Sequence, residues 1–141
     1  MPDSITLTGI FRGFRPGALF KLSDKTFWLQ IDEFMAHHHE VEPLAHIASL
    51  DDGQFLKIDG IDDMVLVHPI HHVIESRIQG RFAGWTGKTV YRLTNGQTWQ
   101  QAKYMTRYAV KYMPDALIWH TPTGTAVMEV AGTSCPVKQI S

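Results

Sequence analysis

The sequence repeats itself after 71 positions, and this repeat constrains the fold more than any other feature. Ten residues between Gly9 and Gly53 recur 71 positions later without a gap. The identical pairs are Gly9/Gly80, Phe11/Phe82, Gly13/Gly84, Leu22/Leu93, Trp28/Trp99, Gln30/Gln101, Pro43/Pro114, Ala45/Ala116, Ile47/Ile118 and Gly53/Gly124. Shared glycines, prolines and tryptophans at a fixed spacing indicate that one unit was duplicated.

Two units follow from the repeat, and we expect them to span residues 1–72 and 73–141. A one-residue insertion after Gly53 extends the alignment to the pairs Gly60/Gly132 and Val65/Val137. A unit of this size buries only about 60% of its unfolded surface, so each unit alone would be marginally stable.

The two halves carry opposite charge, although the whole chain has a net charge of only −1. Residues 1–74 hold 5 Lys/Arg and 11 Asp/Glu, a net of −6, whereas residues 75–141 hold 8 and 3, a net of +5. This asymmetry favours either packing of the halves against each other or two different ligand surfaces.

Membrane spans, secretion signals and disulfides are not expected. No apolar run approaches the roughly 18 residues of a membrane-spanning helix, and the first four residues lack the basic character of a secretory signal. Cys135 is the single cysteine, so it has no partner for an internal disulfide. We expect a cytoplasmic protein without membrane contact.

The pattern predicts strands throughout. Apolar residues alternate with Thr and Gly from Ile5 to Phe11, as in a half-buried strand. Asn95-Gly96 separates two strand-like runs and is a strong two-residue hairpin signal, because both turn positions need positive φ. Residues 102–112 place a tyrosine at every fourth position, which fits a strand or a helix; the prevalence of Tyr, Thr and Val favours the strand.

Five or six short strands in each unit predict a compact β fold. Small antiparallel barrels accommodate this many strands in so few residues. The predicted fold class is all-β, with two tandem small barrels of the Src-homology-3 type, or of an oligonucleotide-binding-like relative, related by internal duplication.

The second half carries a characteristic pattern. Its residues are, in order, Gly80-Arg81-Phe82-Ala83-Gly84-Trp85-Thr86-Gly87, then Tyr91-Arg92-Leu93-Thr94-Asn95-Gly96-Gln97-Thr98-Trp99-Gln100-Gln101, then a Tyr-rich stretch before Pro114. This pattern resembles a widespread small bacterial domain of uncharacterised function. The resemblance covers residues 76–141 well and residues 5–70 in outline. It supports the fold and brings no activity, cofactor or catalytic residue.

A two-residue turn at Asn95-Gly96 fixes the predicted hairpin register. Trp99 would then face Arg92, and Trp28 would face Lys21 in the first half. Each Trp would point away from the core, within cation–π reach of its basic neighbour. The outward Trp-x-Gln pairs would form a second core edge, a seam between the repeats or a ligand surface. These pairs are Trp28/Gln30 and Trp99/Gln101.

Basic and aromatic residues interleave in the Tyr-rich stretch, as in proteins that stack bases and neutralise phosphates. The basic residues are Lys103, Arg107 and Lys111, and the aromatic ones are Tyr104, Tyr108 and Tyr112. On a strand we expect the tyrosines to point into the barrel and the basic side chains into solvent, which weakens the nucleic-acid interpretation. Asp32 and Glu40 occupy the positions of Lys103 and Lys111 in the first half, so the two strands would complement each other in charge.

A histidine cluster is the candidate metal site. On a strand, His37 and His39 share a face with Glu33, a set of side chains able to hold a divalent metal ion. The spacing matches no established zinc signature. Exposed histidines that replace tyrosines are the alternative interpretation.

No motif typical of catalysis stands out, and the glycines from Gly80 to Gly87 lack the Lys of a phosphate-binding loop. We therefore interpret the chain as a non-catalytic binding or interaction module without a cofactor, and we expect a macromolecular partner, a protein in the first place. The alternatives are a metal-binding protein or enzyme that uses His37 and His39, and a nucleic-acid-binding protein that uses the basic second repeat. The candidate binding surface comprises Lys21, Trp28, Gln30, Arg92, Trp99, Gln101, Lys103, Arg107 and Lys111.

Overall fold

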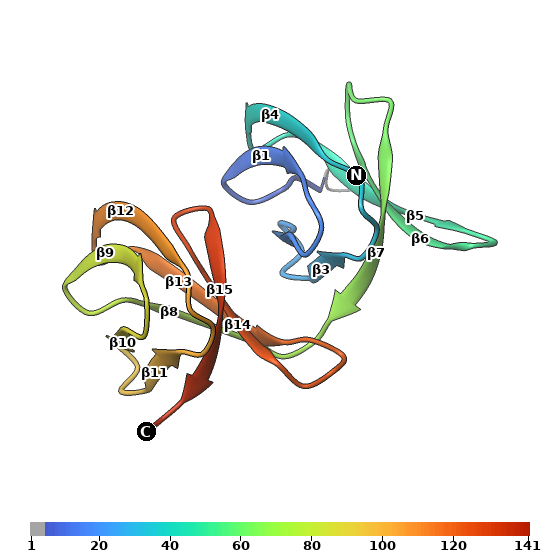
Figure 1. Cartoon of the computed structure of the whole chain (residues 1–141). Coiled ribbons are helices and arrows are strands. Elements are labelled where there is room, and N and C mark those ends of the chain that lie inside the picture. The colour runs from blue at the N-terminus through green and yellow to red at the C-terminus, as the bar shows by residue number, and fades with distance from the viewer. Residues whose placement is uncertain (1–4) are drawn as a thin grey trace. The chain divides into compact units, whose positions relative to one another are not determined.

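All regular structure in the computed structural model is β-strand. The structure describes residues 5–141, and no helix occurs in that range. This confirms the predicted all-β class. The chain divides into two compact units, unit 1 (Met1–His71) and unit 2 (His72–Ser141), which run from blue to green and from green to red in Figure 1.

Unit 1 contains a bent five-stranded antiparallel sheet and a separate two-stranded ribbon. Its strands are β1 (Ile10–Phe14), β2 (Leu19–Lys21), β3 (Phe27–Gln30), β4 (Ala36–Val41), β5 (Ala45–Leu50), β6 (Gly53–Ile58) and β7 (Met64–Ile70). The sheet order is β2-β3-β7-β6-β5, and the ribbon pairs β1 with β4. The segment before β1 joins the two ends of the sheet, because Thr6 bridges to Leu44 beside β5 and Leu7 bridges to Leu22 beside β2.

Unit 2 has the same order of strands, preceded by one more. Its strands are β8 (Val73–Arg77), β9 (Arg81–Thr86), β10 (Val90–Arg92), β11 (Thr98–Gln101), β12 (Thr106–Tyr112), β13 (Asp115–His120), β14 (Ala126–Val130) and β15 (Thr133–Gln139). The sheet order is β10-β11-β15-β14-β13-β8, and β12 pairs with β9 in a ribbon. After β8 the chain bridges at Ile78 to Leu93, and the N–H of Gln79 donates to the carbonyl of Arg92 at 2.7 Å. The sheet curves into a half-barrel, and the residues that directly follow its outer strands β8 and β10 are bridged (Figure 1).

Equivalent hairpins of the two units pair in the same register. Phe20 lies opposite Trp28 in β2 and β3, and Tyr91 lies opposite Trp99 in β10 and β11. The corresponding residues of the two pairs, Phe20 and Tyr91, and Trp28 and Trp99, are each 71 positions apart, as in the sequence repeat.

The predicted pair Val65/Val137 is wrong. Val137 lies opposite Gln101 in β11, and the residue that lies opposite Gln30 in β3 is Val67. The loop between β6 and β7 is longer than the loop between β14 and β15. Part of the length difference between the units therefore lies in this loop. A single insertion after Gly53 does not account for it.

The short hairpins have three-residue loops in place of the predicted two-residue turn. In unit 2 the N–H of Gly96 donates to the carbonyl of Leu93 at 3.1 Å, and the N–H of Leu93 donates to the carbonyl of Gln97 at 2.9 Å. Gly96 has a φ of 91°, and Lys25 has a φ of 70° at the equivalent place in unit 1. A type I turn followed by a left-handed residue makes such a loop. The additional loop residue shifts the predicted register by one.

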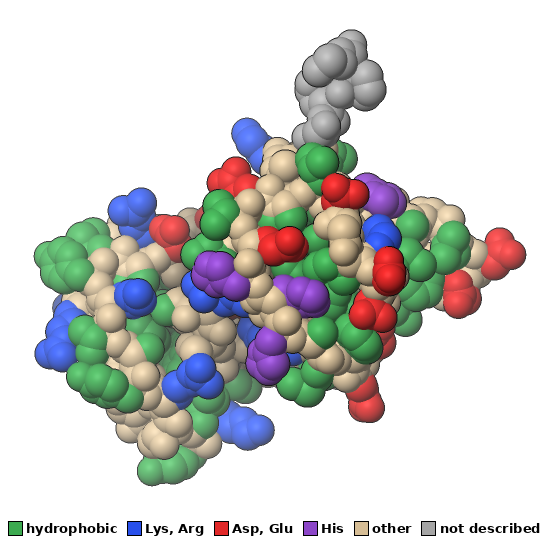
Figure 2. Space-filling model, turned by 90° about the horizontal axis from the view of Figure 1, so that it is seen from above, with side chains coloured by type: hydrophobic (Ala, Val, Ile, Leu, Met, Phe, Trp, Pro, Cys, Tyr) green, Lys and Arg blue, Asp and Glu red, His purple; other side chains and the backbone are tan. Residues whose placement is uncertain are grey.

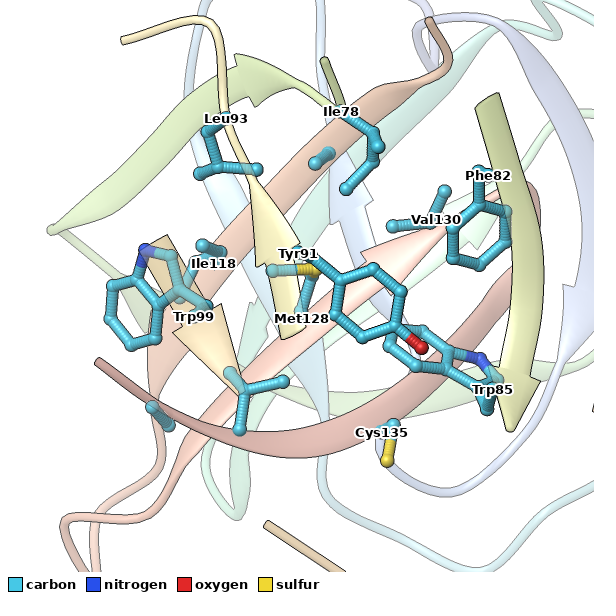
Figure 3. Close-up of a cluster of buried hydrophobic side chains, with 13 residues drawn as sticks. Ile78, Phe82, Trp85, Tyr91, Leu93, Trp99, Ile118, Met128, Val130 and Cys135 are labelled. Carbon is cyan, nitrogen blue, oxygen red and sulfur yellow. The ribbon is translucent and has the colours of Figure 1, made fainter. Parts of the chain in front are cut away.

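Each unit has a hydrophobic core of its own. In unit 2 the rings of Phe82, Trp85 and Tyr91 contact one another with centroids 5.3 to 5.8 Å apart (Figure 3). Such pairs contribute about 0.5–1.5 kcal/mol each beyond the burial of area. The indole N–H of Trp85 donates to the hydroxyl of Thr133 at 2.8 Å, which satisfies a buried donor. Unit 1 is built in the same way around Phe11, whose ring lies 5.1 Å from that of the neighbouring Phe14.

Candidate binding surface

The ribbon of β9 and β12 carries the candidate surface of unit 2. The strands are antiparallel, and Tyr112 lies opposite Arg81. A bulge interrupts the register between Tyr108 and Lys111. Residues 106–112 form a strand, as predicted, and the helix alternative is wrong for them.

A glycine allows the two strands of the ribbon to approach closely. A Cβ atom on Gly84 would collide with the carbonyl oxygen of Arg107, and Gly84 has a φ of 101°. In unit 1, a Cβ atom on Gly13 would collide with the carbonyl oxygen of Ala36 in the same way. Other residues fit poorly at either position, which explains the glycine at this place in both units.

Three tyrosines of unit 2 point into solvent. Tyr104, Tyr108 and Tyr112 are 73%, 78% and 78% exposed. The predicted inward orientation is therefore wrong, and Met105 and Ala109 pack against the core instead. The basic residues of the same stretch are exposed as well: Lys103, Arg107 and Lys111.

Gln101 holds the loop that presents Tyr104. The Gln101 side chain is 2% exposed, and its Nε2 donates to the carbonyls of Lys103 at 3.0 Å and Met105 at 2.8 Å. Its Oε1 accepts the N–H of Gly87 at 3.2 Å. The Tyr104 ring lies against Gly87, because a Cβ atom added there would be 3.2 Å from the ring carbon Cε2. One buried amide thus ties together the two loops that position the ring.

Gln30 makes the equivalent contacts in unit 1. Its Oε1 accepts the N–H of Arg15 at 2.9 Å, and its Nε2 donates to the carbonyl of Phe34 at 2.7 Å and to Asp32 Oδ1 at 2.9 Å. The other oxygen of Asp32 accepts the N–H of Leu66 at 2.8 Å. The Asp32 carboxylate therefore holds loops of unit 1 together, and its predicted role as a charge that complements the second repeat stays a prediction.

The Trp-x-Gln pairs do not point outward as predicted. Trp99 is 2% exposed, lies opposite Tyr91 and belongs to the core of unit 2. Trp28 is half-buried, lies opposite Phe20 and packs against the core of unit 1. The prediction assumed a two-residue turn, and a shift of one residue moves every side chain of a strand to its other face. Of the three predicted roles for these tryptophans, which were core, seam between the repeats and ligand surface, Trp99 has the core role.

The predicted contacts between tryptophan and a basic residue are also changed by this shift. Lys21 lies opposite Phe27, and its Nζ is 5.7 Å from the centroid of the Phe27 ring. Arg92 lies opposite Thr98 and is exposed. Lys21 thus has an aromatic neighbour, but it is Phe27 in place of Trp28.

The structure does not assemble the predicted metal ligands. His37 and His39 are exposed on β4, and Glu33 is exposed in the loop before it. Within residues 5–141 no group of three or more His, Cys, Asp or Glu side chains is arranged to hold a metal ion. His38, between the two predicted ligands, stacks on Phe11 with the ring centroids 5.6 Å apart.

The segment that carries the ribbon has no carboxylate. Residues 76–114 contain seven Lys/Arg and no Asp or Glu. In Figure 2 the blue Lys and Arg side chains of unit 2 are interleaved with green hydrophobic ones, the colour class that includes tyrosine. Arg81 is exposed opposite Tyr112 and is not among the surface residues predicted from the sequence. The long run without acidic residues is the signal that would have drawn attention to it.

Two buried titratable groups lie in the core of unit 2. Burial raises the pKa of the Cys135 thiol, and burial raises the pKa of the Tyr91 phenol above its ordinary value. The Tyr91 O–H donates to the carbonyl of Gly84 at 2.8 Å. Both groups stay protonated at neutral pH, so neither is an activated nucleophile.

No segment of residues 5–141 forms a helix with the length and apolar character needed to cross a membrane. Comparisons of the chain with protein-family models, with curated proteins and with solved structures each found no match. The geometry of the ribbon is therefore the basis for assigning a function.

Proposed function

We propose that the chain is a non-catalytic binding module that holds an anionic macromolecule on the ribbon of unit 2. The exposure of Tyr104, Tyr108 and Tyr112, at 73%, 78% and 78%, carries this proposal. Exposed apolar surface gathered in one place marks interaction sites. Because the basic side chains of the same stretch are exposed as well, the partner that suits it is negatively charged.

The fold that supports this surface is, we propose, a small Src-homology-3-like barrel, duplicated in tandem. The bridges Thr6–Leu44 and Leu7–Leu22 in unit 1 and Ile78–Leu93 in unit 2 connect the two ends of each sheet and support a closed barrel. The shared hairpin register and the equivalent hydrogen bonds of Gln30 and Gln101 support duplication. Membership of the bacterial domain family with the same Gly, Trp and Gln pattern, and a cytoplasmic location, belong to this proposal.

The surface differs between the two units, and this points to unit 2 as the binding unit. The residues of unit 1 that correspond to the three tyrosines are Glu33, His37 and Val41. Unit 1 therefore keeps the supporting glutamine without the rings. The alternative function, a metal site on His37 and His39, has no ligand group to support it within residues 5–141.

Heparin, a polyanion without aromatic bases, provides the test. A Lys103→Gln/Arg107→Gln/Lys111→Gln variant should elute from immobilised heparin at a lower salt concentration than the unchanged protein. The matched control removes three exposed charges elsewhere in unit 2: Lys88→Gln, Arg92→Gln and Lys138→Gln. An equal shift for both triple variants contradicts a binding surface on the ribbon, because only total charge would then matter.

A further inference from the structure

We infer that the anionic partner is single-stranded nucleic acid, with bases stacked on the tyrosine rings and phosphates bound by the neighbouring basic side chains. This inference rests on the proposed function. The proposed function requires only that the ligand is negatively charged. The inference requires in addition that the ligand carries one planar aromatic group for each negative charge.

A basic residue directly precedes each exposed tyrosine. The three dipeptides are Lys103-Tyr104, Arg107-Tyr108 and Lys111-Tyr112, and they recur every four residues. One cation and one open ring per repeat match one phosphate and one base per nucleotide. Proteins that bind single strands without reading sequence combine these two elements.

The spacing of the rings favours an unstacked strand. Tyr108 and Tyr112 are four residues apart on β12, at most about 13 Å at the usual rise of a strand. Stacked bases follow one another at about 3.4 Å. The two rings are therefore too far apart for adjacent bases of a stacked strand. A duplex keeps the faces of its bases covered by its own stacking.

The third ring is held in place before any ligand arrives. Tyr104 lies against Gly87, and the loops on both sides are fixed by the hydrogen bonds of Gln101. A ring that is fixed by its backbone surroundings yet 73% exposed loses little conformational freedom on binding. No carboxylate between residues 76 and 114 repels a phosphate backbone.

An acidic protein would be the other anionic partner of this surface. It would satisfy the basic side chains but has no general need for three open rings, each beside a cation. The recurrence of the dipeptide is therefore the observation that favours nucleic acid, and an acidic protein becomes an outcome of the test.

Fluorescence anisotropy of the full chain with labelled oligo(dT) and oligo(rU) of about 12 nucleotides tests the inference. The single strands should bind more tightly than a duplex of equal length. Neutralisation of three phosphates predicts a slope of about −2 for log K against log salt concentration, and each basic residue replaced by Gln should reduce it by about 0.7.

Variants separate stacking from charge. Tyr108→Ala and Tyr112→Ala should each weaken single-strand binding by about 5- to 150-fold, while Tyr108→Phe keeps the ring and restores most of the affinity. The matched control is His37→Ala, at the position of Tyr108 in unit 1, which should bind like the unchanged protein. Heparin retention should be the same for Tyr108→Ala and the unchanged protein.

The outcomes distinguish the two proposals. Heparin binding through the basic ribbon without measurable oligonucleotide binding overturns the inference and leaves the proposed function standing. Equal affinity for duplex and single strand, or Tyr108→Ala with unchanged oligonucleotide affinity, overturns the inference as well. Failure to bind either polyanion through the ribbon overturns both.

Discussion

The side-chain amide of Gln101 donates a hydrogen bond to the carbonyl oxygen of Met105 at 2.8 Å. Gln30 does the same to Phe34 in unit 1, at 2.7 Å. Both glutamines are almost fully buried, at 2% and 1% exposure, and each makes hydrogen bonds to main-chain atoms of the loops around it. A buried polar side chain in this position is a structural support for the loops around it.

Replacement of Gln101 should therefore destabilise the protein. Gln101→Ala leaves the N–H of Gly87 and two carbonyls without their partner, and we expect a loss of about 2–3 kcal/mol in the free energy of unfolding. Urea unfolding measures it. The neighbouring half-buried Gln100 provides the control, because Gln100→Ala removes a single hydrogen bond, to the carbonyl of Lys88. Equal losses for the two variants would show that Gln101 gives no special support.

The left-handed residue of each hairpin predicts a reciprocal pair of substitutions. Lys25 has a φ of 70°, where glycine stands in unit 2 as Gly96 with a φ of 91°. Lys25→Gly should relieve strain and raise the melting temperature, with a gain of up to about 1 kcal/mol. Gly96→Lys should lower it by a similar amount. Changes of the same sign in both variants would contradict the shared three-residue loop.

The buried hydrogen bond between Trp85 and Thr133 predicts an interaction energy that a double-mutant cycle can measure. Thr133→Val leaves the indole N–H of Trp85 unsatisfied and also removes the bond from the Thr133 hydroxyl to the carbonyl of Val130. We expect a loss of about 1–3 kcal/mol. In the background of Trp85→Phe, which has no N–H to satisfy, the same substitution should cost about 1 kcal/mol less. Purely additive losses would exclude the bond.

Stability should fall in alkaline solution because of the two buried groups of unit 2. Burial raises the pKa of both Cys135 and Tyr91 in the native state. The unfolded chain releases the thiol proton above about pH 8.5 and the phenol proton above about pH 10, while the native state retains both. The unfolded state then binds fewer protons, so the free energy of unfolding decreases as pH rises.

Unfolding measured from pH 7 to 10.5 checks this dependence. Cys135→Ala should flatten the decline that begins near pH 8.5, and Tyr91→Phe should flatten the part above about pH 10. Tyr108→Phe, which removes a phenol from the exposed ribbon, is the matched control for Tyr91→Phe. An identical slope in the unchanged protein and Cys135→Ala would contradict a role for the buried thiol.

The composition of the Tyr-rich stretch outweighed its helical spacing and correctly predicted the strand at residues 106–112. The strand predicted from Ile5 to Phe11 was wrong in its start, because the observed strand begins at Ile10. The orientation of side chains was harder to predict, since it depends on the loop type. Asn95-Gly96 is compatible with a two-residue turn and with a three-residue loop ending in left-handed Gly96, and only the second places Trp99 in the core.

The direction of the tyrosines could not be predicted from alternation along the strand. The ribbon lies outside the main sheet, and a bulge between Tyr108 and Lys111 breaks the period of two on which such predictions rest. Close contact at Gly84 depends on the partner strand, which the local sequence does not reveal. The acid-free run of residues 76–114, by contrast, is visible in the sequence alone.

The hydrogen bonds by which Gln101 holds the two loops go to main-chain atoms: one N–H and two carbonyls. Hydrogen bonds to the main chain do not depend on which side chains the loop carries. Residues 103 and 104 can therefore be randomised without loss of the loop conformation. In unit 1 the corresponding glutamine also binds the side chain of Asp32, and that position is correspondingly less free to vary. Unit 2 is thus the half from which new recognition specificities are more readily selected.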